Sequence, residues 1–595
     1  MKDRSEIENK YKWDLTHLYK DLKEFNEDCD FIKNQIPKIV KYSEKDLSDK
    51  NNMFECLELI LNATKKLWKL YGYADKLFDQ DQTNEEAIIL KDQLSDLYTE
   101  YSSNLSFLSD RIISFDDITI ENLFKDSNLL DDYKFGILNT YDSKKHFLSE
   151  PEEKLLSQIS DVFSTSDEVY TIFKNTELKH GKFKLQSGEE IDLNSLTFSQ
   201  LQHSDIREDR ENAYAQFYNT YDNFKGTFSK LLFKFIKNDT TFAKVRKYDS
   251  SLHSALTSEK IPTSLYENLI KNVSKNIHRY TDYLSLKKDM LGYDELKYYD
   301  LNNPIIKGSE LEYDYESGKK LVLEATAILG KDYTEIMNDA FNDGWIDVYP
   351  NKNKDTGAYM SGSAYDEHPY ILLNYDNKFG DVSTLAHELG HAAHSVYSNA
   401  NQHFDCSSYS TFIAEIASIT NEILLFNHMY DNSNDDSEKI TILNKYIETF
   451  RSTVYRQTMF AEFEKFMYES VENGEVLTAS FLNDEYLTLL KKYHTGMSFD
   501  DKYANEWARV PHFYYNFYVF QYSTSFIAAN MIATRILSGD TEQLEKYKEL
   551  LKSGGSDFPI ALLNKAGVNL EDEKCYDIVF EDFSKKLQLL KELTK

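Results

Sequence analysis

The run S-T-L-A-H-E-L-G-H-A-A-H, from Ser383 to His394, decides how this chain is interpreted. Its apolar residues recur at helical spacing, and Asp381 or Ser383 can cap the helix that this spacing predicts. On such a helix His387 and His391 lie one turn apart, about 6 Å along the axis, so both imidazoles project from one face. Two imidazoles held in this way can bind a single metal ion at about 2 Å each, which is why an H-E-x-x-H sequence predicts a metal site.

Glu388 stands beside the two histidines, where it can reach a water on the metal rather than the metal itself. A carboxylate in that position is suited to act as the general base of metal-assisted amide hydrolysis. The alternative is that His387 and His391 are two ordinary histidines on a helix surface. A third ligand from elsewhere in the chain would distinguish a metal site from this alternative.

Two residues compete for the place of the third ligand. His394 lies on the same side of the helix as His387 but about 10 Å further along its axis, so a rigid helix cannot bring both to one ion. Glu415 lies in a second predicted helix, 411–428, amid apolar residues. A carboxylate there is costly unless it is paired or bound to a metal. We therefore expect Glu415 to complete a two-histidine, one-glutamate site, whose open fourth position is typical of catalytic zinc.

Glu422 lies two turns beyond Glu415, on the same face of that second helix. It can orient a ligand histidine by accepting the hydrogen of the second ring nitrogen. A buried salt bridge or a solvated helix edge explains Glu422 equally well, so the sequence leaves its role open. Asp381 can likewise orient a ligand histidine, or it can cap the helix that carries His387 and His391, which we call the metal helix.

A second group of polar aromatic residues follows Pro511. Four of them recur at spacings that place them on one helical face: His512, Tyr515, Tyr518 and Tyr522. Phenol and imidazole groups beside a metal ion can donate hydrogen bonds to the oxyanion that develops during hydrolysis. Aromatic stripes at helical spacing usually belong to a core. The polar tips of these residues favour a site, because each buried hydroxyl would need a partner.

The rest of the chain predicts a mostly helical protein with at least two lobes. Its 595 residues exceed what one hydrophobic core accommodates. It holds only 20 glycines and 8 prolines, and this scarcity of helix breakers favours helices. Two segments depart from helical patterning: 179–193 reads as a small hairpin, and 345–380 contains two strand-like runs, 357–360 and 370–374.

Charge and composition restrict the partners that we expect. With a formal net charge of −32, the protein repels nucleic-acid phosphates and anionic membrane surfaces, so we expect neither as a partner. The four cysteines lie far apart, as in proteins of a reducing compartment. No stretch reads as a secretory leader or a membrane span, and we therefore expect a cytoplasmic protein.

Together these motifs resemble oligoendopeptidase F, one of the thimet-oligopeptidase-like zinc metallopeptidases. The resemblance extends over essentially the whole chain and is strongest around the metal helix. Besides the H-E-L-G-H-A-A-H run, it rests on the stretches 11–15 (YKWDL), 246–250 (RKYDS), 357–359 (GAY), 369–374 (PYILLN), 412–418 (FIAEIAS) and 511–515 (PHFYY).

The resemblance implies a mainly α, two-lobed, zincin-like fold with a deep central channel and a small β patch beside the active-site helix. It divides the chain into a helical N-terminal region, 1–200, and a catalytic region, 201–595. It implies one Zn²⁺ per chain, with Glu388 as general base and three ligands: His387, His391 and Glu415.

The resemblance also implies two sets of substrate contacts. One set lines the cleft or binds the peptide: Gly357, Ala358, Tyr359, Leu372 and Tyr518. The other set contacts the substrate or its oxyanion: His512, Tyr515 and Tyr522. Which tyrosine fills which role is left open.

The function that follows is hydrolysis of internal bonds in short oligopeptides, by a metal-activated water with Glu388 as the general base. An exopeptidase of the carboxypeptidase type would use the same zinc chemistry, but it needs a dedicated group for a chain terminus. A peptide-binding protein without catalysis is a further alternative, and the presence of Glu388 beside all three predicted ligands argues against it. The sequence leaves the cleavage preference and the oligomeric state open.

Overall fold

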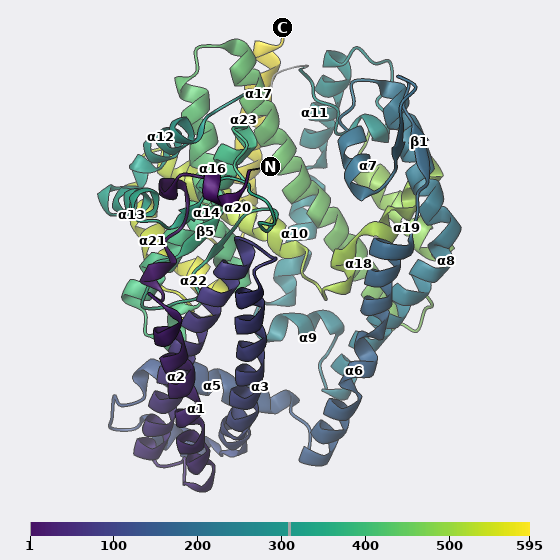
Figure 1. Cartoon of the computed structure of the whole chain (residues 1–595). Helices are drawn as coiled ribbons and strands as arrows, with labels where there is room; N and C mark the ends of the chain where they lie inside the picture. Colours follow the sequence, from purple (N-terminus) through teal and green to yellow (C-terminus); the bar gives the residue numbers. More distant parts are fainter. Residues whose placement is uncertain (1, 307–310) are drawn as a thin grey trace. The chain divides into compact units, whose positions relative to one another are not determined.

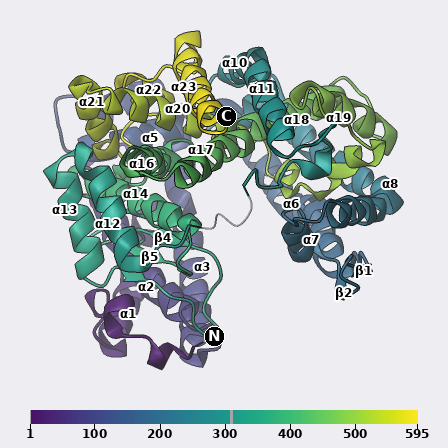
Figure 2. The same ribbon diagram turned by 90° about the horizontal axis from the view of Figure 1, so that it is seen from above.

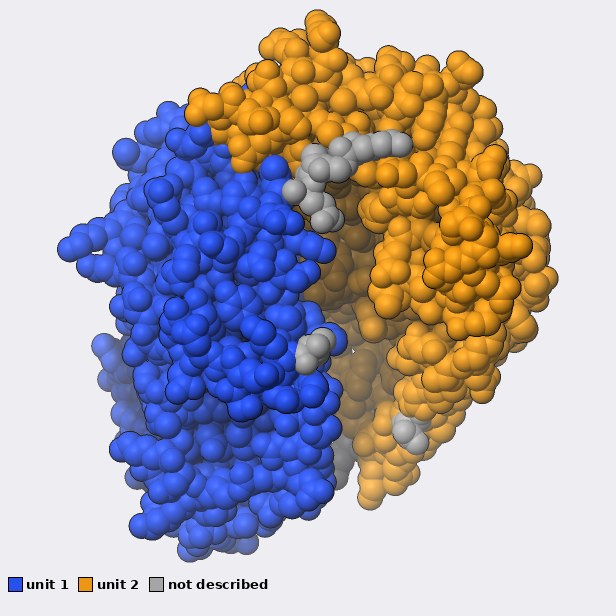
Figure 3. Space-filling model, turned by 45° about the horizontal axis from the view of Figure 1, so that its top comes forward, with its two compact units in different colours: residues 1–145, 310–432, 529–568 blue, residues 146–309, 433–528, 569–595 orange. Residues whose placement is uncertain are grey.

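The computed structural model describes residues 2–306 and 311–595, and most of them lie in α-helices (Figure 1). The chain forms two compact units, each built from three separate segments. Unit 1 comprises Met1–Lys145, Glu310–Asn432 and Ala529–Val568; unit 2 comprises His146–Ser309, Ser433–Ala528 and Asn569–Lys595 (Figure 3). The mainly helical class and the two lobes are therefore confirmed. The channel and the division at residue 200 stay predictions.

Unit 1 combines helices with a small sheet. Its helices are α1 (Leu22–Val40), α2 (Lys50–Asp79), α3 (Glu85–Ser114), α4 (Asp117–Phe124), α5 (Lys134–Asp142), α12 (Tyr315–Thr326), α13 (Lys331–Asn342), α14 (Phe379–Asn401), α15 (Phe404–Ser407), α16 (Thr411–Asn432), α21 (Thr541–Lys552) and α22 (Pro559–Lys565). Helix α20 (Phe520–Leu537) has residues in both units.

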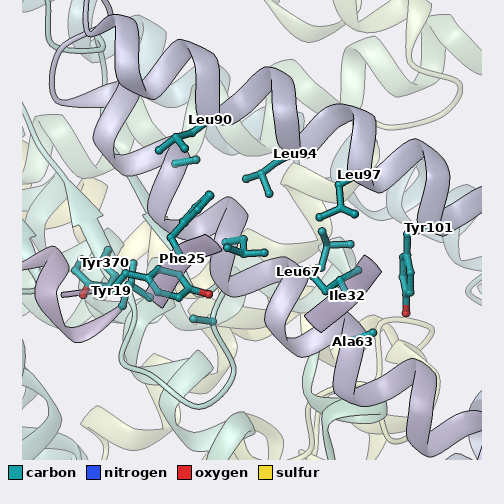
Figure 4. Close-up of a cluster of buried hydrophobic side chains, with 14 of the residues drawn as sticks. Tyr19, Phe25, Ile32, Ala63, Leu67, Leu90, Leu94, Leu97, Tyr101 and Tyr370 are labelled. Atoms are coloured by element: carbon teal, nitrogen blue, oxygen red, sulfur yellow. The ribbon is translucent and has the colours of Figure 1, made fainter. Parts of the chain in front are cut away.

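The first three helices of unit 1 enclose an apolar core (Figure 4). Helix α3 contributes buried side chains that recur every three or four positions and so line one face: Leu90, Leu94, Leu97 and Tyr101. Tyr370, which belongs to the sheet, lies in the same cluster. The core thus anchors the sheet to the N-terminal helices.

The sheet of unit 1 has the strand order β3 (Ile346–Asp347), β5 (Tyr370–Leu372), β4 (Tyr359–Ser361). Strand β5 is parallel to β3 and antiparallel to β4, and all of its side chains are buried. The β patch predicted at 345–380 is therefore confirmed. Strand β4 forms one edge of this sheet.

The metal helix, α14, begins earlier than either predicted cap position. Its first residue is Phe379, and Ser383 lies inside the helix, so the prediction that Ser383 is a cap is wrong. Asp381 lies in the first turn, where its carboxylate accepts the backbone N–H groups of Asp376 and Lys378, both at 2.9 Å. Asp381 therefore stabilises the start of the helix by binding otherwise unpaired N–H groups.

Helices α14 and α16 run side by side in unit 1 (Figures 1 and 2). Gly390 permits the close approach, because a Cβ atom there would lie 2.6 Å from the Cα of Ser418. The Asn421 side chain also donates a hydrogen bond of 3.0 Å to the carbonyl of Ala386. These contacts set the position of the Glu415 carboxylate relative to the two histidines.

Unit 2 is also helical. Its helices are α6 (Glu150–Ile172), α7 (Ser195–Leu201), α8 (Arg207–Val245), α9 (Ser251–Thr257), α10 (Thr263–Lys275), α11 (Ile277–Met290), α17 (Asp436–Phe450), α18 (Arg456–Glu472), α19 (Ala479–Tyr493) and α23 (Glu573–Leu593). The hairpin predicted at 179–193 is present as β1 (Lys182–Lys184) and β2 (Glu190–Asp192). Over the described parts of both units, every helix is too short or too polar to cross a membrane.

Candidate metal centre

Three donor atoms converge where α14 passes α16. The Nε2 atoms of His387 and His391 lie 3.2 Å apart. Oε2 of Glu415 lies 3.3 Å from the first of them and 3.5 Å from the second. Successive turns of α14 present the two imidazoles, and α16 presents the carboxylate. The three residues predicted as ligands therefore lie together in unit 1.

The spacing of these three atoms fits a metal ion. Ligands placed about 2.0 Å from a tetrahedral zinc ion are about 3.3 Å from one another. The three separations in this centre range from 3.2 to 3.5 Å. Two imidazoles and one carboxylate are also a donor set of catalytic zinc sites, which keep a further position open. The residues present thus suit the ion that the sequence predicts.

Glu422 contacts His387 at the ring nitrogen that is not one of the three converging atoms. The Nδ1–H of His387 donates to Oε1 of Glu422 at 2.7 Å, and Ser383 donates to the other oxygen of this carboxylate at 2.8 Å. This arrangement leaves the lone pair of the His387 Nε2 atom directed at the centre. This contact fits the orienting role of Glu422, but the same two groups form an ion pair when His387 is protonated. The orienting role therefore stays a prediction.

The electrostatics of the centre favour a positive charge among its donors. Burial alone would lower the pKa of His387, but hydrogen bonds to Glu415 and Glu422 raise it overall. Burial alone would raise the pKa of Glu415, but its hydrogen bonds to His387 and His391 lower it overall. A carboxylate that stays ionised is the form that binds a cation.

Glu388 lies beside the centre without joining the three converging atoms. Its side chain is only 6% exposed, and burial raises the pKa of its carboxyl group despite the two nearby imidazoles. The backbone of Met360, in strand β4, lies close enough to this carboxyl group to lower its pKa in part. A carboxyl group with a raised pKa is better matched to proton transfer near neutral pH.

His394 takes no part in the centre. It is buried and stacks on Tyr409, with ring centroids 3.6 Å apart. Neither ring nitrogen has a hydrogen-bond partner among the described residues. Burial lowers the pKa of His394 to about 3, so its ring is neutral. The expectation that His394 is a neighbour and not a ligand agrees with this placement.

A pocket of about 240 Å³ opens beside the start of α14. Two of the residues predicted to bind substrate line it, Gly357 and Ala358. The other lining residues come from the segment after β5 and from the first turns of α14: Leu373, Asn374, Tyr375, Asp381 and Thr384. The pocket therefore connects the β patch to the helix that carries the histidines.

Leu372 and Tyr359 occupy different places from those predicted. The Leu372 side chain is fully buried in the core cluster that includes α1 to α3, so the prediction that it lines the cleft is wrong. Leu372 lies in the central strand, and its burial follows from packing on both faces of the sheet. The Tyr359 ring packs against the same core and its hydroxyl donates to Asp79, although the residue stays partly exposed.

The polar aromatic residues near the C-terminus do not lie on one helix, and that prediction is wrong. Residues Pro511–Tyr514 form a 3₁₀ turn, α20 begins only at Phe520, and Asn516 and Phe517 between them have positive φ values of 39° and 59°. Left-handed residues end a helix because they turn the backbone away from its axis.

The same side chains nevertheless form a cluster within unit 2. The ring of His512 lies 5.8 Å from the rings of both Tyr515 and Tyr522, and Tyr518 lies 5.4 Å from Tyr522. The Tyr522 hydroxyl is 3.4 Å from Nε2 of His512. Tyr515 is 54% exposed, so the alternative that this residue belongs to the core is wrong.

A buried carboxyl group holds the bend that carries this cluster. Glu464, on α18, is fully buried, and its Oε1 accepts the backbone N–H of Phe517 at 2.9 Å. Burial raises the pKa of Glu464 to about 8. The contact stabilises a backbone conformation that is costly for residues other than glycine. Sequence reasoning missed Glu464, although its position on the apolar face of α18 was a signal.

Replacing Glu464 by glutamine is expected to flatten the dependence of stability on pH. The folded pKa of about 8 lies above the ordinary value of 4.5, so the folded state keeps a proton that the unfolded state loses. The free energy of unfolding therefore decreases as the pH rises through this interval, with a slope of up to about 1.4 kcal/mol per pH unit. Glutamine keeps the acceptor for Phe517 and does not titrate.

Urea unfolding between about pH 5 and pH 9 measures this effect. The difference in stability between the variant and the parent protein should grow with pH and level off above the pKa of Glu464. Parallel curves for the two proteins would show that Glu464 does not titrate in this range.

A two-histidine, one-glutamate centre with a buried carboxyl group beside it, in a mostly helical protein, defines the class of metallopeptidases. The pattern of peptidase family M3 matches residues 200–581, and a second pattern, described as oligopeptidase F, matches residues 111–180. This chain belongs to peptidase family M3 and is a metalloendopeptidase.

Individual relatives match this chain over most or all of their own length. Oligopeptidase PepF of Bacillus subtilis is 35% identical over 592 residues, which are 99% of this chain and 88% of that protein. A protein of Chlamydophila abortus with a solved structure has a TM-score of 0.94 at 34% identity, with 100% of each chain covered. Oligoendopeptidase-F of Enterococcus faecium has a TM-score of 0.73 at 31% identity, over 96% of this chain and 99% of that one.

Proposed function

We propose that this chain is a cytoplasmic zinc endopeptidase that hydrolyses internal bonds of short oligopeptides. The observation that carries the proposal is the convergence of donor atoms from His387, His391 and Glu415 beside the buried Glu388. The relatives named oligopeptidase and oligoendopeptidase support the substrate class. The four cysteines are free thiols, which suits a reducing compartment.

The three converging residues would hold one zinc ion per chain, and Glu422 would keep His387 in the tautomer whose Nε2 can bind. When bound, zinc supplies Lewis-acid chemistry, since it lowers the pKa of a water and polarises a carbonyl group. Glu388 accepts the proton of the attacking water and later delivers it to the leaving amine nitrogen. The raised pKa of Glu388 supports this role, because the carboxyl group must hold the proton between the two transfers.

Strand β4 is the part of unit 1 best suited to receive the peptide backbone. It pairs with β5 on one side, and no other strand of the described chain pairs with its second side. An extended peptide can add to such an edge through main-chain hydrogen bonds. The backbone of Met360 lies close to the carboxyl group of Glu388, so this strand runs next to the proposed base. Gly357 and Ala358 lead into β4, and the pocket that they line can take a substrate side chain.

We assign the clustered aromatic residues of unit 2 to substrate and oxyanion binding. Tyr518 would contact the peptide, whereas His512, Tyr515 and Tyr522 would donate hydrogen bonds to the oxyanion. The exposure of Tyr515 supports this assignment, as does the proximity of the Tyr522 hydroxyl to the His512 ring.

Replacing Tyr522 by phenylalanine removes one hydroxyl group and leaves the ring in place. If the hydroxyl donates to the oxyanion, kcat should decrease by about 10²–10³-fold with little change in KM. Tyr515→Phe and His512→Ala are the parallel variants, and two donors to one oxyanion should give non-additive losses. Steady-state kinetics with a fluorogenic peptide measures these effects. Normal turnover in all three variants, with lower thermal stability, would assign the cluster to packing.

Mass spectrometry of the products from a peptide library tests the proposed function. We expect internal cleavage of short peptides, abolished by 1,10-phenanthroline and restored by Zn²⁺. Release of single C-terminal residues would establish the exopeptidase alternative. Cleavage that resists complete removal of metal would contradict the proposed chemistry.

A further inference from the structure

Three side chains from distant parts of unit 1 meet at a second place. His17 ends the short 3₁₀ turn η3 (Leu15–His17), Asp343 follows α13, and His368 precedes β5. One donor atom from each of them lies within 4.8 Å of the others. The Nδ1 of His17 and the Nε2 of His368 are only 2.8 Å apart. This set shares no residue and no helix with the centre on α14 and α16.

The ring of His368 presents a lone pair to His17. Its Nδ1 lies 2.9 Å from the carbonyl oxygen of Pro369, which can only accept a hydrogen bond, so Nδ1 carries the proton. The Nε2 atom is therefore the unprotonated nitrogen, and it faces His17. Stacking on Trp345, with ring centroids 4.8 Å apart, holds the ring in this orientation. A backbone carbonyl that fixes the tautomer of an imidazole is typical of metal-binding histidines.

The backbone around the three residues is held closely together. The N–H of Asp14 donates to the carbonyl of Gly344 at 2.7 Å, and the Tyr370 hydroxyl donates to the carbonyl of Asp14 at 2.8 Å. Gly344 has a positive φ of 66°, and a Cβ atom there would lie 2.8 Å from the Cβ of Asp14. The positions of His17, Asp343 and His368 thus follow from a tightly packed junction.

We propose that a second divalent transition-metal ion binds to His17, Asp343 and His368. Zinc is the ion with which we test this site. Two imidazoles and a carboxylate are ligands that zinc accepts, and the exposure of Asp343 leaves room for water as a further ligand. The ion would join the N-terminal segment to the turn after α13 and to the strand β5. Its role is to stabilise this junction, which adjoins the sheet that contains β4.

The alternative to a bound metal ion is a simple hydrogen bond between the two imidazoles. In it, the Nδ1–H of His17 donates to the Nε2 of His368, and Asp343 is a solvated neighbour. The distance of 2.8 Å suits such a bond. The two arrangements differ in what Asp343 does. A metal ion would draw its carboxylate, which lies within 4.8 Å of both nitrogens, into the site, whereas the hydrogen bond leaves this carboxylate in solvent.

Metal stoichiometry in a variant that lacks the first centre tests the proposal. The chain carrying His387→Ala and His391→Ala is stripped with EDTA and titrated with Zn²⁺ by calorimetry, with Co²⁺ absorption as a second probe. We expect one zinc per chain. Adding His17→Gln should weaken this binding by more than about 100-fold, and Asp343→Asn by at least about 10-fold.

His428→Gln is the matched control. His428 lies 3.3 Å from Glu324 in a histidine–carboxylate pair of unit 1, and its loss should leave the zinc titration unchanged. Because Asp343 is exposed, Asp343→Asn should fold normally, and at the same zinc concentration its Tm should rise less than that of the parent background. A background that binds no zinc at micromolar concentration would overturn the proposal, as would zinc binding that survives His17→Gln and Asp343→Asn together.

Discussion

Glu388→Gln is expected to lower kcat by about 10³-fold, within the range that general acid–base catalysis contributes, while the metal stays bound. Glutamine has nearly the same volume as glutamate but cannot take the proton of the attacking water. Glu388 is buried and lies outside the three converging donor atoms, so the change should leave those atoms and the fold in place. The loss should therefore appear in kcat and not in the zinc content.

Glu422→Gln provides the contrast. Glu422 accepts a hydrogen bond from His387 but does not face the three donor atoms, so its replacement should weaken zinc binding by about 10–100-fold. At saturating zinc this variant should recover much of its turnover, whereas Glu388→Gln should not. Zinc content and kinetics are measured on both. If Glu388→Gln retains more than about a tenth of the parent rate, Glu388 is not the base.

Loss of a ligand should have an equally large effect, with a different signature. Glu415→Ala and His391→Ala each remove one of three donor atoms, and both should lose bound zinc together with activity. The remaining donors cannot hold the ion as tightly, because two ligands leave more of its coordination to water. The two helices should remain packed, since their contacts at Gly390 and Asn421 are unchanged.

His394→Phe is the matched control for these ligand variants. Phenylalanine preserves the stacking on Tyr409, and the replaced ring nitrogens have no partner among the described residues. This variant should keep a full zinc complement and most of its activity. Metal analysis by mass spectrometry after gel filtration measures all three proteins. Zinc loss in His394→Phe with retention in Glu415→Ala would reverse the assignment of the third ligand.

Local periodicity explains why the metal helix could be predicted. The convergence of His387 and His391 needs only the spacing of an α-helix, which short-range hydrogen bonds create. The assignment of Glu415 needed one further argument, the cost of a carboxylate among apolar residues. The predicted cap positions lie too late in the chain because Asp381 binds the free N–H groups from inside the first turn of α14. Preferences for the residue that precedes a helix do not describe this arrangement.

Long-range contacts explain the predictions that were wrong. The spacing of the aromatic residues from His512 to Tyr522 suits a helix, but the left-handed backbone at Asn516 and Phe517 interrupts it. Glu464, more than 50 positions away in the sequence, holds that backbone through its hydrogen bond to Phe517. Leu372 likewise became a core residue because α1 to α3 pack against the sheet. Nothing within either local segment encodes these partners.

The sequence by itself determined the helical class, the pair of histidines on one helix face, the glutamate beside them and the family to which the chain belongs. Each of these depends on residue types at short spacing, where backbone geometry leaves few alternatives. Only the tertiary structure decided which tyrosines cluster, which strand is buried and how His17 comes to lie 2.8 Å from His368. Those placements depend on packing between segments that are remote along the chain, and side-chain burial selects them only once the whole unit has formed.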